Sequence, residues 1–197
     1  MARDSYHHGD LRNALVSGGV DLARAGGVAA VVLTRLARGA GVSPAAAYRH
    51  FPGGHEELLD AVAEQARVEL ADRMACGVTD APVSADPVRS ALWRFRGVGR
   101  AYVDFAVEQP GLFELACLRD HDLAHDGGVA ALLNACLDEL VAVGRLPTGR
   151  RPRTEVAAWA AVHGLALLLT SGPLAALTEA EKEAVIERTL EVVGAGI

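Results

Sequence analysis

The chain has 197 residues, of which 51% are hydrophobic, 22% charged and 5% aromatic. This balance is typical of a globular protein and excludes intrinsic disorder and collagen-like repeats. The net charge of -6 is uneven: residues 1–55 hold six arginines against three aspartates, a net of +3, and the remainder holds 13 cations against 22 acids, a net of -9. The asymmetry predicts a basic module that meets an anion, joined to an acidic body with another task.

The first fifty residues have the pattern of three short helices. Apolar spacing, capping residues and glycine stops place these helices over 10–25, about 34–40 and about 44–51. Gly41 is expected to end the second helix in the left-handed conformation, with Ala40 facing inward before it. Ser43 as N-cap and Pro44 as first helical residue begin the third helix.

Six more helices are expected in the remainder of the chain. They are placed at 56–75, 88–106, 111–118, 129–140, 154–171 and 178–193. Residues 77–87 are predicted as a linker, and residues 144–152 as a basic loop. Because no segment alternates apolar and polar residues as a strand does, the sequence predicts an all-α fold.

The stretch from Leu36 to Phe51 has the spacing of a helix-turn-helix motif. Ala37 is small where the second helix crosses it, Gly41 forms the turn, and Ala47 closes the core between the two helices. A helix presented in this way fits the major groove of DNA. The motif therefore predicts double-stranded DNA as the anionic partner of the basic module.

At these residues the sequence resembles the TetR family of bacterial transcriptional regulators. The stretches from Tyr6 to Arg12 and from Ser43 to Phe51 carry the resemblance, and Trp159 with His163-Gly164 is similar to a subgroup with a Trp-His-Gly type C-terminal domain. The resemblance implies a three-helix DNA-binding domain over residues 1–55. It also implies a helical bundle over residues 56–197 that binds a ligand and forms a homodimer.

The family analogy assigns ten residues to DNA contact: Thr34, Arg35, Ser43, Pro44, Ala45, Ala46, Tyr48, Arg49, His50 and His55. It implies phosphate contacts for Tyr48 and His50, and base contacts for Arg49 and the edge formed by residues 44–46. His55 stands near the position of a family lysine that meets a phosphate, but neutral histidine brings no full charge. The alternatives are that Tyr48 and His50 pack against the body and that Arg35 is simply solvated.

For the body, the resemblance implies a pocket for a small, mostly apolar effector. The candidate lining residues are Trp93, Phe95, Arg96, Tyr102, Phe105, Phe113, Leu133, Cys136, Trp159 and His163. Small and apolar residues on the last two helices predict a two-fold four-helix dimer interface, with Ala157, Ala161, Gly164, Leu168, Ile186 and Leu190 in it. The alternatives are plain core packing for the aromatic residues, and a central core helix of a monomer for residues 154–171.

Other kinds of site find little support in the sequence. His121 and His125 are four residues apart, a spacing that a metal site can use, but an acidic solvated loop is the preferred interpretation, and no metal or cofactor is predicted. The three cysteines form no closely spaced pair, and the most apolar run, 157–169, is shorter than the roughly 20 residues of a membrane helix. With no secretory signal visible, the sequence predicts a cytoplasmic protein.

The leading hypothesis is a dimeric regulator, most simply a repressor, that binds a palindromic operator and is released by a small ligand. A helical enzyme with His163 or the His121 and His125 pair as base is the second hypothesis, and it lacks a recognisable nucleophile, acid pair or phosphate loop. We therefore predict that the protein is not an enzyme. The third hypothesis is a helical ligand-binding or scaffold protein that does not bind DNA.

Overall fold

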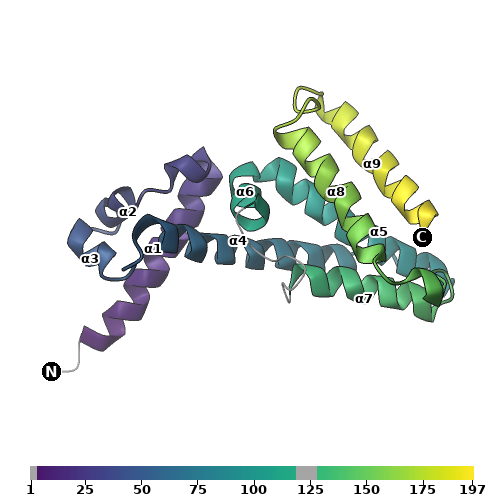
Figure 1. Cartoon of the computed structure of the whole chain (residues 1–197), viewed down its shortest axis with the longest axis horizontal. Helices are drawn as coiled ribbons and strands as arrows, with labels where there is room; N and C mark the ends of the chain where they lie inside the picture. Colours follow the sequence, from purple (N-terminus) through teal and green to yellow (C-terminus); the bar gives the residue numbers. More distant parts are fainter. Residues whose placement is uncertain (1–3, 119–127) are drawn as a thin grey trace. The chain divides into compact units, whose positions relative to one another are not determined.

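A computed structural model describes residues 4–118 and 128–197, and these residues form an all-helical fold (Figure 1). Its helices are α1 (Asp4–Gly26), α2 (Leu33–Gly39), α3 (Pro44–Tyr48), α4 (Gly54–Thr79), α5 (Pro87–Glu108), α6 (Pro110–Leu118), α7 (Val129–Ala142), α8 (Thr154–Thr170) and α9 (Glu179–Gly196). Two single-turn 3-10 helices, η1 (Val28–Ala30) and η2 (Thr148–Arg150), stand between them. The predicted all-α class is confirmed.

The helices form two compact units. Within the described residues, the first unit consists of 4–68 and 109–118, and the second of 69–108 and 128–197. Helix α4 contributes to both, since the division falls after Val68. The first unit thus takes α6 from a later part of the sequence, which the helical periodicity did not predict.

The core of the first unit joins α1, α2, α3 and the start of α4. Leu15, Ala37, Ala47, Phe51 and Leu58 are almost fully buried there. Burial of such side chains contributes the larger part of the stability of short helices, which are marginal in isolation. The three helices of the motif are therefore held by one another.

Helix α6 packs against α1 and η1 in the same unit. The Nε of Arg24 in α1 donates a hydrogen bond to the Oε1 of Gln109, 3.0 Å away, just before α6 begins. Leu112 and Phe113 are fully buried on this helix. Helix α5 ends before Pro110, because proline cannot donate a backbone hydrogen bond and disfavours helical geometry at Gln109. Helix α6 begins at Pro110 and packs against α1.

In the second unit, α5 is central and contacts α7, α8 and α9. Helix α4 meets α5 at Gly77 and Gly97, where a Cβ added to Gly97 would lie 2.1 Å from the carbonyl oxygen of Gly77. A distance of 2.1 Å is far inside van der Waals contact, so both positions must lack a side chain for the two backbones to meet. Glycine is required here by packing.

Ion pairs and capping bonds fasten the outer helices of this unit. On α5, Arg100 bonds Asp104 and also reaches Glu183 and Glu187 of α9. The predicted basic loop caps the end of α9, since the Nη2 of Arg145 donates to the carbonyl of Gly194, 3.1 Å away. Arginine at a helix C-terminus satisfies carbonyls and opposes the negative end of the helix dipole.

Several helix ends differ from the sequence predictions. Helix α3 ends at Tyr48 rather than near residue 51, because the backbone bonds from His50 to Ala47 and from Phe51 to Tyr48 are of the tighter, three-residue kind. Helix α4 continues to Thr79, so the linker begins only after it. Ala40, expected to face inward, is exposed.

Candidate DNA-binding surface and ligand cavity

The turn between α2 and α3 has the predicted capping chemistry. The Oγ of Ser43 accepts a hydrogen bond from the backbone N–H of Ala46 at 3.2 Å, and Pro44 stands in the first turn. Gly41 has a φ of 69°, in the region that favours glycine. With Ala37 and Ala47 fully buried between the helices, the outer face of α3 is fixed relative to α2.

The residues predicted to contact DNA lie on or near the surface of the first unit. Ala46 and His50 are half-buried, and the others are exposed: Thr34, Arg35, Ser43, Pro44, Ala45, Tyr48, Arg49 and His55. Tyr48 exposes 47% of its surface, which is unusual for a large aromatic residue. Tyr48 therefore presents part of its side chain at the surface of the first unit.

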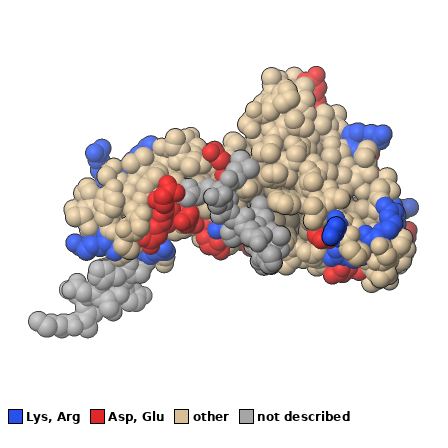
Figure 2. All heavy atoms as spheres, in the orientation of Figure 1, with Lys and Arg blue, Asp and Glu red and all other residues tan. Residues whose placement is uncertain are grey.

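Three arginines of this unit have no carboxylate partner among the described side chains. Arg35, Arg38 and Arg49 are exposed on α2 and at the end of α3. In Figure 2, separate basic side chains stand at the edge of the left part of the view, in the region of α2 and α3. A guanidinium without a carboxylate keeps its full charge and all its donors for an external anion, and phosphate is the anion that it matches in geometry.

Arg12 behaves differently, because it stabilises the turn between α3 and α4. Its guanidinium lies 5.1 Å from the ring centroid of Phe51, and its Nη2 is 4.0 Å from Glu57 Oε1. The other oxygen of Glu57 accepts a hydrogen bond from the backbone N–H of Gly53 at 2.8 Å. His55, which follows Gly54 in the first turn of α4, is therefore presented on a constrained turn.

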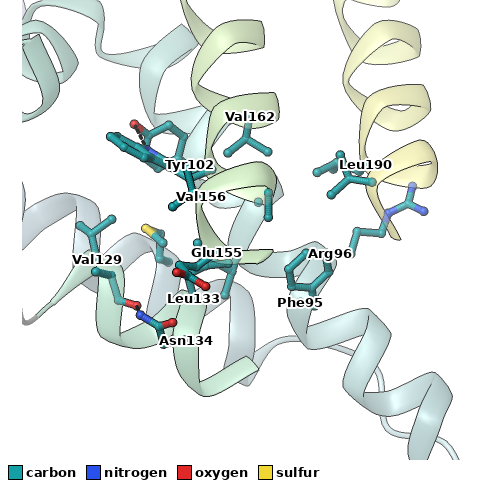
Figure 3. A pocket seen from close by; sticks show the side chains of 17 residues that line it. Phe95, Arg96, Tyr102, Val129, Leu133, Asn134, Glu155, Val156, Val162 and Leu190 are labelled. Atoms are coloured by element: carbon teal, nitrogen blue, oxygen red, sulfur yellow. Dashed lines mark hydrogen bonds between the residues drawn. The ribbon is translucent and has the colours of Figure 1, made fainter. Parts of the chain in front are cut away.

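The second unit contains a cavity of about 210 Å³ between α4, α5, α7, α8 and α9 (Figure 3). Its wall is mainly apolar and aromatic, with Phe95, Tyr102, Leu133 and Trp159 among the lining residues. An engineered cavity of about 150 Å³ holds benzene, so this cavity has room for a somewhat larger organic molecule. Arg96, Asn134 and Glu155 supply its polar groups together with the Tyr102 hydroxyl.

Tyr102, His163 and Trp159 form a hydrogen-bonded group at the cavity. The Tyr102 hydroxyl lies 2.8 Å from His163 Nδ1 and accepts a hydrogen bond from Trp159 Nε1 at 3.3 Å. Burial lowers the pKa of His163, because desolvation disfavours the imidazolium form. The neutral imidazole can accept a hydrogen bond from the Tyr102 hydroxyl at Nδ1, so this group stabilises the wall without a net charge.

The structure brings together only some of the predicted pocket residues. Phe95, Arg96, Tyr102, Leu133 and Trp159 line the cavity. The others lie elsewhere: His163 behind Tyr102, Trp93 along a separate open groove, Phe105 and Cys136 in the core, and Phe113 on α6 in the first unit. Burial raises the pKa of the Cys136 thiol to about 11, so it is not a reactive thiolate.

Periodicity did not identify the polar residues of the cavity, Asn134 and Glu155. Asn134 belongs to an otherwise apolar stretch and Glu155 follows a basic one, and both are held by Arg151 from the loop before α8. A polar residue within an apolar helical stripe was the one signal in the sequence that pointed to Asn134. Glu155 lies in the first turn of α8, where an acidic residue has an ordinary explanation in the helix dipole.

The predicted dimer residues divide between surface and core. Ala157 and Leu168 are exposed on α8, and Ala161 and Gly164 are half-buried on the same helix. Ile186 and Leu190 are instead buried within the chain, and a Cβ added to Gly99 of α5 would lie 2.9 Å from Leu190 Cδ2. The apolar residues of α9 at these positions thus pack inward.

Two further sequence features concern metal binding and membranes. His121 and His125 lie outside the described residues, and the described residues contain no group of three or more potential metal ligands. In the described part of the chain, none of the helices has the length and apolar character that crossing a membrane requires.

The exposed helix-turn-helix surface and the apolar cavity together define a helix-turn-helix DNA-binding protein with a separate helical unit. A family profile described as "Bacterial regulatory proteins, tetR family" matches residues 15–62. A second, "Tetracyclin repressor-like, C-terminal domain", matches residues 95–193, just over half of the chain. The chain therefore belongs to the TetR family of transcriptional regulators, which is not a family of enzymes.

Individual relatives agree with this assignment. An uncharacterized HTH-type transcriptional regulator, YobS of Bacillus subtilis (strain 168), is 32% identical over 108 residues. The match covers 55% of this chain and 52% of YobS, so the chain spans about half the length of that curated relative.

Two solved structures are similar to the whole chain. One is a protein of unknown function from Rhodococcus sp. RHA1, with 29% identity, a TM-score of 0.72 and 99% coverage of both chains. The other is RolR in complex with resorcinol, with 18% identity and a TM-score of 0.64, covering 96% of this chain and 90% of RolR. At 18% identity, the likeness to RolR shows a shared fold and nothing more.

Proposed function

We propose that this protein is a homodimeric repressor that binds a palindromic operator and is released by a small, mostly apolar ligand. The observation that carries the DNA-binding part is the set of exposed arginines without carboxylate partners among the described side chains, Arg35, Arg38 and Arg49. They lie on α2 and at the end of α3, on which Tyr48 is exposed. Phosphate contacts position such a unit, and side chains at base edges select the sequence.

On this proposal, nine of the ten predicted DNA contacts divide between two tasks, and Ser43 caps α3. Arg49 is the residue suited to bidentate bonding with guanine, whereas the short side chains at 44–46 offer little beyond contact with a thymine methyl. Thr34, Arg35, Tyr48, His50 and His55 would then meet the backbone. Because few base contacts are available, DNA shape is expected to contribute to selectivity.

The dimer is proposed to form through α8, with α9 beside it. Val156, Ala157 and Leu168 leave an exposed apolar face on α8, with open space around Gly164. Val192 adds an exposed apolar residue on α9. Small residues allow helices of two copies to approach closely. Ile186 and Leu190 are not part of the proposed interface, because the chain's own core buries them.

The ligand is proposed to occupy the cavity of the second unit, which lies in the region of the matched C-terminal family domain. Binding of resorcinol by RolR, a protein with the same fold, agrees with a small molecule of this kind. A ligand releases the protein from DNA only if it binds the free conformation more tightly than the DNA-bound one. We place the protein where its DNA is, in the cytoplasm.

Selection of bound DNA from a random duplex pool tests the proposal. The wild type should enrich a palindrome, and Arg49→Ala and Tyr48→Ala should lose it. Arg89→Ala is the matched control, because Arg89 is an exposed arginine of the second unit whose guanidinium lies over the Trp93 ring. Light scattering should give a particle of twice 20.6 kDa. A well-folded dimer that enriches no sequence at low salt would favour the scaffold hypothesis instead.

A further inference from the structure

One carboxylate faces the cavity among apolar and aromatic side chains. Of the described lining residues, Arg96 and Glu155 carry a formal charge (Figure 3). Arg96 forms an ion pair with Glu187 of α9, so its charge is already balanced. Glu155 is paired with Arg151, a residue that does not line the cavity. The balance of charge around Glu155 therefore depends on what else Arg151 binds.

Arg151 is shared among three acceptors. Its Nη1 donates to Glu155 Oε2 at 2.8 Å, its Nε to Asp138 Oδ1 at 2.7 Å, and its Nη2 to Asn134 Oδ1 at 2.7 Å. One guanidinium thus serves two carboxylates, and the group has a net charge of -1. The Asp138 side chain is 67% exposed and screened by water, whereas that of Glu155 is 32% exposed. The excess negative charge acts mainly at the cavity wall.

Glu155 also has an acceptor to spare. Within the described part of the chain, its hydrogen bond and ion pair both use Oε2, which leaves Oε1 for a ligand. Other polar groups of the wall are engaged: Asn134 Nδ2 donates to the carbonyl of Ala130 at 2.9 Å, and the Tyr102 hydroxyl bonds both His163 and Trp159. A ligand that enters the cavity therefore meets two charged groups, the spare carboxylate oxygen of Glu155 and the guanidinium of Arg96, whose charge Glu187 balances.

We propose that the cavity selects an organic cation, a small apolar or aromatic body bearing one ammonium group, and that Glu155 binds the ammonium. The apolar wall takes the body, and the rings of Phe95 and Trp159 add faces that attract cations. An anionic ligand is disfavoured, because Glu155 repels it and Arg96 already serves Glu187. This inference depends on the proposed role of the cavity as a ligand site and specifies its chemistry.

Three probes with one skeleton test the charge preference: 2-phenylethylamine, 2-phenylethanol and phenylacetate. Calorimetric titration of the full chain at pH 7 should give the amine an affinity about tenfold or more above that of the alcohol, the ratio that roughly 1.4 kcal/mol produces. Phenylacetate should bind most weakly. Equal affinities of the amine and the alcohol would overturn the inference, and a preference for phenylacetate would assign the polar contact to Arg96.

Glu155→Gln is the deciding variant, because it keeps the size of the side chain and an oxygen for Arg151 while removing the charge. In this variant the amine should lose its advantage over the alcohol. Glu191→Gln makes the same charge change on α9 at a residue that does not line the cavity, and should leave the advantage intact. An advantage that survives in Glu155→Gln, with an unchanged melting curve, contradicts the assignment.

The outcomes also separate this inference from the proposed function. If the alcohol binds and the amine does not, Glu155 has no such role, but the cavity remains a ligand site. If none of the three probes binds the wild type, both the charge preference and the ligand cavity are wrong.

Discussion

Each unit contains a set of arginines whose environment is the opposite of that of the set in the other unit. In the first unit, Arg35, Arg38 and Arg49 have no carboxylate partner among the described side chains. In the second unit, Arg94 and Arg100 are held by carboxylates of neighbouring helices. The guanidinium groups of the first set are available to an external anion, whereas those of the second set form ion pairs that join helices. Whether an arginine has a carboxylate partner is therefore more informative about its role than the number of arginines in a segment.

The largest expected effect comes from Arg49→Ala. Loss of a bidentate contact to guanine should weaken operator binding by about 1–3 kcal/mol for each bound copy, with no loss of stability, because the side chain is exposed. Fluorescence anisotropy with the selected duplex measures the affinity, and a melting curve checks the fold. Unchanged affinity for the operator would show that this unpaired arginine is only a solvated one.

A second variant tests the close packing of α4 against α5 in the second unit. Gly97→Ala forces a methyl group against the backbone of Gly77 and should destabilise the protein by about 1–3 kcal/mol, the usual cost of overpacking. Gly194→Ala is the control, because it is a helical glycine with open space around it and should stabilise by up to about 1 kcal/mol. Urea denaturation measures both. Equal stabilities of the two variants would contradict the close contact of α4 and α5.

Arg100→Ala and Arg35→Ala compare the two kinds of arginine directly. Removal of Arg100 leaves Asp104, Glu183 and Glu187 without this partner, and should cost roughly 1 kcal/mol, since such pairs are partly exposed. Arg35→Ala should change the free energy of unfolding by less than about 0.5 kcal/mol. For DNA binding, the variant with the larger effect should be Arg35→Ala, because only this variant should reduce the dependence of affinity on salt. The same stability loss in both variants would remove the contrast between the units.

The smallest effect concerns pH. Burial holds the pKa of His163 below its unfolded value of about 6.5, so the unfolded chain binds the proton more readily. The stability contributed by neutral His163 is present above about pH 6.5 and is lost as pH falls toward the folded pKa. Urea midpoints should therefore decrease between pH 7.5 and 5.5, and His163→Gln should reduce that decrease. The exposed His55 provides the control, since His55→Gln should retain the full decrease.

Paired carboxylates do not contribute to a change in stability between pH 7.5 and 5.5, because they titrate at lower pH. Ion pairing with Arg94 lowers the pKa of Glu139, and bonding to Arg100 lowers that of Glu183. Their contribution is present above about pH 4.5 and is lost only at more acidic pH. A pH dependence between 7.5 and 5.5 that is the same in wild type and His163→Gln would show that His163 does not titrate there.

Local sequence was sufficient for the parts of the fold that depend on near neighbours. Ser43 caps α3, Gly41 has the expected positive φ, and Thr178 with Glu181 forms a capping box at the start of α9, within a helix predicted to begin at residue 178. Each of these interactions joins residues at most a few positions apart, so residue type alone decides them. The same local chemistry, together with apolar spacing, predicted the helix-turn-helix motif and the exposed side chains on it.

The pairing of helices was decided by the tertiary structure. From the sequence, Phe113 is a candidate lining residue of the pocket that the family resemblance implies, and Ile186 is a candidate for the dimer face. In the structure, Phe113 belongs to the first unit and Ile186 is buried within the chain. Helical spacing shows which residues share a face but not what that face meets. Arg24 and Gln109, 85 residues apart, meet in one contact, and Arg96 and Glu187, 91 apart, meet in another. Contacts of this span form only once the whole chain has folded.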